Sequence, residues 1–178
     1  MAAIVLERLQ RRFGEAIVET SSQHGNETAV VVRGRLHEIA ELLRDDPDLA
    51  FNVPIDCTAV DWLGKRAARF EVVYHLYSLT KGHRVRLKVQ VPESDPTCPS
   101  LTDLWPGMNW HEREAWDLYG IRFVGHPNLK RVLMYEEFVG HPLRKDYPID
   151  GRQPRVAMRE VKDVPTQRQP PRELLNEP

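Results

Sequence analysis

Two stretches near the start of the chain carry hydrophobic residues at helical spacing. The first covers residues 4–13 and is followed by Gly14, a residue type that commonly ends a helix. The second covers residues 35–44, where the apolar positions define one face, and an Asp-Asp-Pro sequence follows it. The pattern therefore predicts two amphipathic helices.

Five further stretches have the composition of β-strands. Residues 28–32 form a β-branched run that is typical of a buried strand. Residues 84–91 alternate between polar and apolar side chains, as in a strand with one solvent-exposed face and one buried face. Residues 21–27 are expected to form a loop, and the turn at residues 80–82 favours an antiparallel hairpin. The strands are expected at residues 16–19, 28–32, 55–62, 69–77 and 84–91.

This order of elements predicts an α+β fold, a two-layer sandwich of a mixed or antiparallel sheet and helices, with an extended C-terminal tail. A parallel doubly wound sheet would require a different order. Beyond the sheet, residues 100–105 predict a helical turn. Asn109 is a suitable N-cap for a helix over about residues 110–119, which Gly120 would end.

The chain divides into three expected parts. Residues 1–121 form the α+β domain. Residues 122–148, which we call the extension, have no sustained periodicity and contain two Gly-His-Pro turns. Residues 149–178 form a proline-rich, charged tail, which is expected to pack on partner subunits or to be disordered alone.

Composition excludes several classes of protein. The 178 residues carry a net charge of −1 without a basic stripe, which argues against a nucleic-acid binder. The two cysteines, Cys57 and Cys98, form no Cys-x-x-Cys motif, so an iron–sulfur or structural zinc site made by this chain alone is not expected. Apolar stretches fall far short of the ~20 residues that span a bilayer. The N-terminal sequence lacks the pattern of an export signal.

A metal site is considered because residues 111–115 read His-Glu-Arg-Glu-Ala. The start of a zincin helix looks similar, but that motif requires a second histidine where Ala115 stands. His126 and His141 each lie between Gly and Pro, which is typical of turns. No metal site is therefore expected.

A pair of carboxylates allows a catalytic interpretation. Glu114 and Asp117 are three residues apart on one helical face, close enough to influence each other's pKa. Arg113 and Asp117 are four residues apart, which favours an ion pair on a salt-bridged helix surface. The chain has no glycine-rich phosphate loop and no Gly-x-Ser-x-Gly motif. A soluble hydrolase that uses these two acids remains an alternative.

Aromatic side chains gather beside these charges. Trp105 and Trp116 are assigned either to the core or, with Trp110, Tyr119 and Arg113, to a mixed aromatic–arginine patch. That composition is typical of hot spots between proteins. The sequence therefore favours a docking surface over an active site.

The same residues carry a family resemblance. The chain reads Glu112-Arg113-Glu114-x-x-Asp117-Leu118-Tyr119-Gly120-Ile121, then Gly125-His126-Pro127, then Lys130-Arg131-Val132-Leu133. With the flanking sequences, this block covers residues 100–148. It resembles the C subunit of NADH–quinone oxidoreductase, respiratory complex I, in the form that is not fused to the large subunit.

The resemblance implies a non-catalytic scaffold subunit of the peripheral arm that docks on the large quinone-site subunit and touches adjacent iron–sulfur subunits. It implies no flavin, cluster or catalytic residue in this chain. Membrane association is expected only through the complex, on the cytoplasmic face of the bacterial inner membrane in preference to the mitochondrial matrix. The equivalent subunit of a membrane-bound hydrogenase, or of a ferredoxin- or deazaflavin-linked relative, is the main alternative.

The residues expected to contact partner subunits come from the predicted helix at 110–119 and from the extension. They are Trp110, Glu112, Arg113, Glu114, Asp117, Tyr119, His126, Arg131, His141, Arg144, Lys145 and Tyr147. Buried interfacial ion pairs of this kind matter because removal of one charge leaves the other without a partner.

Overall fold

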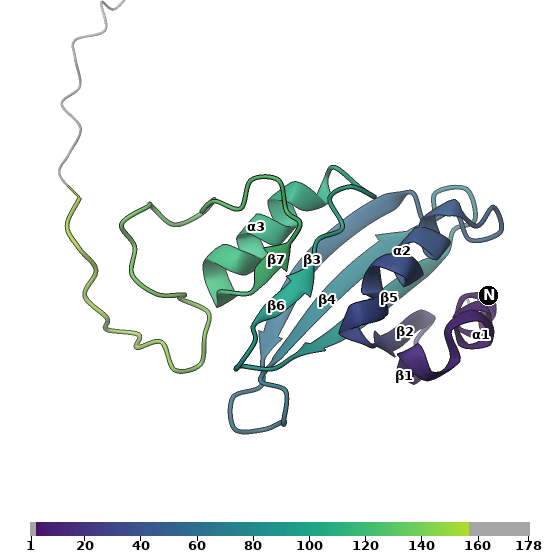
Figure 1. Cartoon of the computed structure of the whole chain (residues 1–178), viewed down its shortest axis with the longest axis horizontal. Helices are drawn as coiled ribbons and strands as arrows, with labels where there is room; N and C mark the ends of the chain where they lie inside the picture. The colour runs from purple at the N-terminus through teal and green to yellow at the C-terminus, as the bar shows by residue number, and fades with distance from the viewer. Residues whose placement is uncertain (1–2, 157–178) are drawn as a thin grey trace, which may run out of the picture.

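The computed structural model describes residues 3–156, in which three helices cover one face of a five-stranded sheet (Figure 1). A separate pair of short strands lies beside the third helix. The expected two-layer α+β architecture is confirmed. The elements, in chain order, are α1 Ala3–Phe13, β1 Ile17–Gln23, β2 Asn26–Val31, α2 Leu36–Asp45, β3 Val53–Asp61, β4 Phe70–Tyr77, β5 Arg84–Val91, β6 Thr97–Pro99, α3 Met108–Tyr119 and β7 Arg122–Val124.

The sheet is mixed, with the strand order β1-β2-β5-β4-β3. Only the β2–β5 pair is parallel, and β4 and β5 form the expected antiparallel hairpin. The small second sheet pairs β6 with β7 in parallel. Strands of three residues are too short to show an alternating pattern, so the sequence did not predict them.

The expected loop at residues 21–27 is wrong, because most of it belongs to a hairpin. β1 continues through Gln23, and β2 begins at Asn26. The two residues between them, His24 and Gly25, both have positive φ, at 54° and 76°. Two successive residues of this kind make the tight turn that suits a twisted hairpin. β1 is a largely exposed edge strand, so its sequence carries no buried alternation.

The core lies between the sheet and the helices and follows the sequence pattern. The apolar side chains of α2 at positions 36, 39, 40 and 43 are all buried. β5 alternates as expected, with its odd-numbered valines and leucine buried and its even-numbered charged residues at least partly exposed. Trp105 is buried and donates from Nε1 to the carbonyl of Phe51 at 3.1 Å, whereas Trp116 packs on the edge of the core.

The third helix begins earlier than the sequence indicates. Asn109 is not its N-cap, because α3 starts at Met108, whose side chain is completely buried. The amide of Met108 donates to the carbonyl of Trp105 at 2.9 Å, so the preceding turn runs directly into the helix. The predicted end is confirmed, since Gly120 caps the helix with a left-handed φ of 78°. Each helix in residues 3–156 is too short or too polar to span a bilayer.

Candidate interface on the third helix and the extension

The extension packs against the C-terminal half of α3 with almost no regular secondary structure of its own beyond β7. Figure 1 shows it leaving the small sheet and running along the side of α3. Irregular backbone must find hydrogen-bond partners outside ladders and helices. Side chains of α3, and Asp61 at the end of β3, supply several of them.

The carboxylate of Asp117 is the centre of this contact. Its Oδ2 atom accepts hydrogen bonds from three consecutive amides, residues 132–134, at 2.9–3.0 Å. Its Oδ1 atom accepts from Nη1 of Arg131 at 2.5 Å, and its side chain is fully buried. Burial alone would raise the pKa of Asp117, but these hydrogen bonds outweigh it and hold the pKa below the ordinary value.

Arg131 extends the network further along the chain. Its Nη2 atom donates to the carbonyls of Phe138 at 2.9 Å and Gly140 at 3.2 Å. Its guanidinium also lies over the rings of Trp116 and Phe138, at 5.8 and 5.7 Å from their centroids. One buried ion pair thus fixes two separate parts of the extension.

Residues 141–144 cap the C-terminus of α3, where carbonyl groups lack partners within the helix. His141 Nδ1 lies 2.9 Å from the carbonyl of Asp117, and the Leu143 amide donates to that of Leu118 at 3.1 Å. Arg144 Nε donates to the carbonyl of Tyr119 at 2.6 Å. A cation at this end of a helix is also favourable for the helix dipole.

Gly120 allows this cap to form. A methyl group at its Cα would lie 2.5 Å from Nη2 of Arg144 and 2.6 Å from the ring of His141. Its φ of +78° is also strained for any residue with a side chain. Both the backbone conformation and the close approach therefore require glycine here.

A second ion network joins the extension to the sheet. Arg69 is nearly buried and donates to Asp61 through Nε and Nη2 at 3.1 and 2.9 Å, and to Asp146 through Nη2 at 2.6 Å. It also pairs with Glu93 at 2.5 Å. Asp61 additionally accepts from the amide of Lys145 at 2.8 Å. This attachment therefore joins the extension to the end of β3, to the residue before β4 and to the segment after β5.

The contacts continue past Pro148. The side chain of Gln153 accepts from the amide of Val139 at 2.9 Å and donates back to its carbonyl at 3.0 Å. Gln153 also bonds to the hydroxyl of Tyr147. The proposed division after Pro148 stays a prediction, and the tail from residue 157 onward lies outside the described residues.

Glu112 is a second buried acid of α3, and within residues 3–156 no cation forms an ion pair with it. Its carboxylate accepts from the hydroxyl of Ser100 at 2.6 Å and from the amide of Leu101 at 2.7 Å. Burial raises the pKa of Glu112 to about 7, because the two hydrogen bonds only partly offset the loss of solvation. The two cysteines are also buried and are free thiols.

This environment predicts that the chain loses stability as the pH rises from about 4.5 to about 7. The folded chain holds the Glu112 proton more tightly than the unfolded chain, so ionisation favours unfolding. The full effect is on the order of 3 kcal/mol. Urea unfolding at pH 5 and pH 8 measures it, and Glu112→Gln should remove this loss. Glu114→Gln, on the exposed face of α3, should keep the pH dependence of wild type. If Glu112→Gln also keeps that pH dependence, the loss of stability arises from another titrating group.

The structure corrects the expected salt-bridged helix surface. Arg113 does not pair with Asp117; it donates to the carbonyls of Lys130 and Arg131 at 3.0 and 3.1 Å and stacks on Trp110. Glu112 and Asp117 are completely buried, so neither can contact a partner from this position. Their carboxylates serve the interior of the chain, because donors there satisfy them.

The other candidates form two groups. The first group is partly buried and makes contacts within the chain: Tyr119, His126, Arg131, His141, Arg144 and Tyr147. The second group is exposed: Trp110, Glu114 and Lys145. Trp110 is 63% exposed and is the largest exposed side chain of α3. Partner contacts of these residues stay predictions. Within residues 3–156 no group of three His, Cys, Asp or Glu side chains could hold a metal ion.

The extension also exposes apolar side chains, which we call the apolar set: Leu133, Tyr135, Val139 and Leu143. Their exposed fractions range from 39% to 65%. Scattered apolar residues are normal on a protein surface, but a concentration of them on a fixed segment is typical of an interaction site.

Comparison with known proteins agrees with the resemblance. Residues 29–153 match the family described as "Respiratory-chain NADH dehydrogenase, 30 Kd subunit". A protein of Roseiflexus sp. strain RS-1, named as the C subunit of NADH-quinone oxidoreductase, is 50% identical over 151 residues, which are 85% of this chain and 86% of that protein. A Geobacter sulfurreducens protein of the same name is 42% identical, over 81% and 88% of the two chains.

Two solved structures share the fold. The trypsin-resistant fragment of Nqo5 is 38% identical with a TM-score of 0.60, over 70% of this chain and 99% of the fragment. A chain of an archaeal membrane-bound sulfane sulfur reductase has a TM-score of 0.67 over 83% and 85% of the chains, but its identity of 21% shows only the fold. On the match of residues 29–153 and the relatives at 42–50% identity, the chain belongs to the family of the 30 kDa subunit of respiratory-chain NADH dehydrogenase, that is, the C subunit of complex I.

Proposed function

We propose that the chain is a non-catalytic scaffold subunit of the peripheral arm, and that its extension docks on the large quinone-site subunit. The observation that carries this proposal is the extension itself. It exposes the apolar set, while Asp117, Arg131 and Arg69 hold it in place through hydrogen bonds within the chain. A surface that is already ordered loses less conformational entropy on binding, so more of the contact energy appears as affinity.

The chemistry of the two α3 acids supports a structural role. Asp117 uses both carboxylate oxygens within the chain, and Glu114 lies on the exposed face of the helix. The geometry therefore gives no support to a hydrolase that uses this pair. On this proposal the flavin and the iron–sulfur clusters reside in partner subunits, and this chain contributes to their fixed spacing.

The proposal includes a location and a set of neighbours. The chain would sit on the cytoplasmic face of the bacterial inner membrane, attached only through the large subunit and adjacent iron–sulfur subunits. The relatives at 42–50% identity, all named as the C subunit of NADH-quinone oxidoreductase, favour NADH as the donor over a hydrogenase or a ferredoxin- or deazaflavin-linked system. NADH-driven quinone reduction by the purified complex would separate these alternatives.

The test is Val139→Asp, with Val18→Asp as its matched control. Both valines are well exposed, at 65% and 61%, but Val18 lies on the β1 edge strand. A charge at residue 139 should lower the yield of assembled peripheral arm at least ~10-fold, since an unpaired charge in an apolar contact costs several kcal/mol. Val18→Asp should assemble normally, and the melting temperatures of both isolated chains should stay near wild type.

The yield of assembled complex and its turnover together distinguish a scaffold role from a catalytic one. Turnover for each assembled complex should be unchanged in Val139→Asp. Normal assembly of this variant would remove the apolar set from the interface. Full assembly combined with lost turnover would contradict the non-catalytic role.

A further inference from the structure

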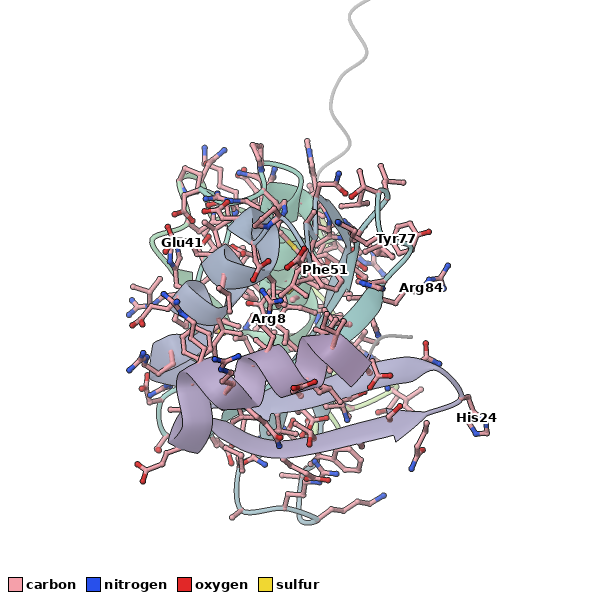
Figure 2. All side chains as sticks on the ribbon, turned by 90° about the vertical axis from the view of Figure 1, so that its right-hand side faces the viewer. Arg8, His24, Glu41, Phe51, Tyr77 and Arg84 are labelled. Carbon is pink, nitrogen blue, oxygen red and sulfur yellow. The ribbon has the colours of Figure 1, made fainter. Side chains whose placement is uncertain are left out.

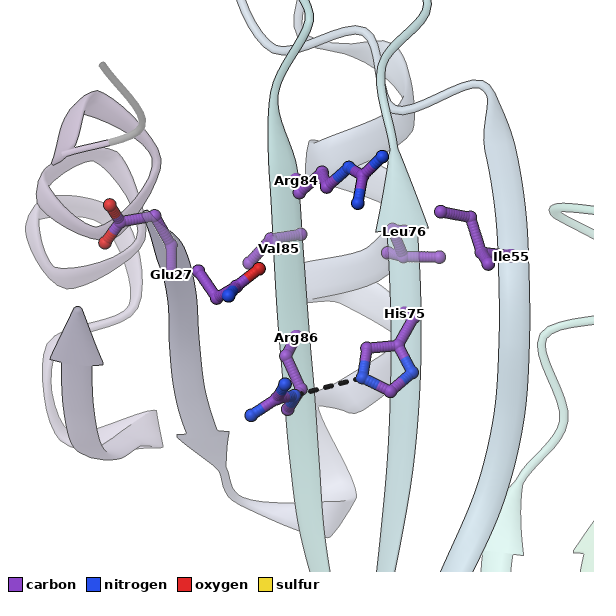
Figure 3. Close-up of a pocket in the computed structure, with 8 residues that line it drawn as sticks. Glu27, Ile55, His75, Leu76, Arg84, Val85 and Arg86 are labelled. Carbon is purple, nitrogen blue, oxygen red and sulfur yellow. Dashed lines mark hydrogen bonds between the residues drawn. The ribbon is translucent and has the colours of Figure 1, made fainter. Parts of the chain in front are cut away.

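The face of the sheet opposite the helices carries cationic side chains on its middle strand. Arg84, Arg86 and Lys88 alternate along β5 with buried apolar residues, so they project from the face that no helix of residues 3–156 covers. Figure 3 shows Arg84 and Arg86 in front of β5 while helices lie behind the sheet. In Figure 2, Tyr77 and Arg84 lie on one side of the molecule and Glu41 of α2 on the other.

Only one of these three cations has an acidic partner in the described chain. Lys88 pairs with Glu71 at 3.0 Å, and the same carboxylate pairs with Arg66 at 2.7 Å. Neither Arg84 nor Arg86 forms an ion pair with an acid of residues 3–156. Side chains two residues apart on a strand project ~7 Å from one another, so two uncompensated charges remain close together.

The immediate neighbours of Arg86 do not neutralise it. Its Nε atom donates to Nε2 of His75 at 3.0 Å, so this nitrogen of His75 must be an acceptor. Burial, followed by the nearby Arg86, lowers the pKa of His75, which keeps the imidazole neutral. Asp56 lies beyond His75, at 3.9 Å from Nδ1, and Glu27 directs its carboxylate away from both arginines (Figure 3).

Apolar and aromatic groups surround the two arginines. Arg84 lies over the ring of Tyr77 at 5.3 Å from its centroid, and Ile55 and Leu79 are exposed nearby on β3 and in the β4–β5 turn. Arg84, Arg86, His75 and Ile55 also line a hollow with a volume of about 240 Å³, together with Asn26 and Glu27 on β2. Arginine, tyrosine and aliphatic groups beside a hollow are the composition of hot spots between proteins.

We propose that this surface is a second docking site, which binds an acidic segment of another peripheral-arm subunit. We call it the arginine face and define it as Ile55, Tyr77, Leu79, Arg84 and Arg86. A carboxylate in the hollow would accept charge-assisted hydrogen bonds from the two guanidinium groups, and the flanking apolar groups of the partner would cover Ile55 and Leu79. A free anion would leave those apolar side chains uncovered, which favours a protein partner.

The position of the arginine face gives the chain two separate contacts. β4 runs from Phe70, next to the Arg69–Asp146 attachment of the extension, to Tyr77 on the arginine face. The two ends of this strand are about 23 Å apart, because seven steps of ~3.3 Å separate them. The inference rests on the proposed scaffold role and deepens it, since one rigid strand would link two neighbours.

The test removes the charges of Arg84 and Arg86 in the full chain, expressed in cells that assemble the complex. Arg84→Gln/Arg86→Gln should lower retention of the chain in the purified peripheral arm at least ~10-fold, and the loss should begin at lower salt than in wild type. Arg11→Gln/Arg12→Gln, two exposed arginines of α1, is the matched control and should behave as wild type. Arg84→Lys/Arg86→Lys keeps the charges and should retain most of the binding.

The partner is identified by a photoreactive benzoylphenylalanine in place of Leu79. The expected cross-link is to a segment of another subunit that contains two or more acidic residues. A cross-link to a neutral or basic segment, to a second copy of this chain, or to nothing would overturn the proposal, as would retention of Arg84→Gln/Arg86→Gln equal to its control. The melting temperature of this isolated variant should stay close to that of wild type, because the removed repulsion opposes the loss of the contacts with His75 and Tyr77.

The test of the arginine face and the test of the extension have independent outcomes. If Val139→Asp assembles normally while Arg84→Gln/Arg86→Gln is lost from the arm, the proposed docking of the extension fails and the arginine face stands. The opposite result removes the arginine face and leaves the extension as the docking segment.

Discussion

Replacement of Asp117 by asparagine is expected to lower the free energy of unfolding of the full chain by about 3–5 kcal/mol. The carboxylate accepts three amides of residues 132–134 at one oxygen and Arg131 at the other, and it is completely buried. An asparagine in either orientation would direct its amide group at one of these two sets of donors. Arg131 would then keep its charge, 15% exposed, without a counter-ion. Urea denaturation of the purified chain measures the loss.

The matched control for this prediction is Glu114→Gln, three residues earlier on the exposed face of the same helix. Its effect should stay within about 0.5 kcal/mol. The pKa of Asp117 is lowered, so the stability from its charge is present at neutral pH and is lost as the pH falls through and below 3.8. The difference between wild type and Asp117→Asn should therefore shrink in acid. A loss below about 1 kcal/mol at pH 7 would mean that the buried carboxylate does not fix the extension.

Replacement of Gly120 by alanine is expected to lower the free energy of unfolding by about 3 kcal/mol. The left-handed backbone contributes about 1 kcal/mol of this loss. The rest arises because the new methyl group would displace His141 and Arg144, and each of these caps a carbonyl of α3. Equilibrium unfolding measures the total, and faster proteolysis after Arg144 would show that the extension has come away from the helix.

Gly125→Ala distinguishes the cost of backbone strain from the cost of displacing neighbouring side chains. Gly125 has a similar φ of +89°, but no atom lies within 4 Å of the position of the added carbon. Its alanine variant should lose only about 1 kcal/mol. Equal losses in the two variants would show that backbone strain accounts for the whole effect, and that the cap on α3 does not require glycine for space.

The layered fold could be predicted because the hydrophobic pattern of its core helices and strands repeats over several turns or alternations. The apolar face of residues 35–44 and the alternation of residues 84–91 each repeat several times, and both elements appear where expected. The β1–β2 hairpin was missed because β1 is an exposed edge strand and buries almost no side chains. Its turn depends on the backbone conformation of His24 and Gly25, which the hydrophobic pattern does not encode.

The candidate site was predicted in composition but not in arrangement. The sequence identified four residues that the structure brings together: Asp117, Arg131, His141 and Arg144. Their hydrogen bonds join α3 to the extension within the chain, and were expected to reach a partner. Helical spacing suggested that Arg113 pairs with Asp117. Spacing along a helix cannot show that an irregular segment 14 residues away supplies a better partner, as Arg131 does.

The Asp61–Arg69 pair was not anticipated, although the sequence contained a signal for it. Asp61 continues the inward-facing register of Cys57 and Ala59 on β3. An acid on the core-facing side of a strand requires a buried donor or cation. Arg69 stands directly before β4, and the pairing of Asp61 with Phe70 brings it back beside this acid.

Hydrogen exchange at the amides of residues 132–134 in the isolated chain tests most directly whether the extension is ordered before any partner binds. All three amides donate to the buried Asp117 carboxylate, so they should exchange at least ~100-fold more slowly than the same amides in an unfolded chain. Asp117→Asn should remove that protection while the amides of β4 keep theirs. Exchange at the unfolded rate in the isolated wild-type chain would contradict the account, because the segment would then acquire its conformation only upon assembly.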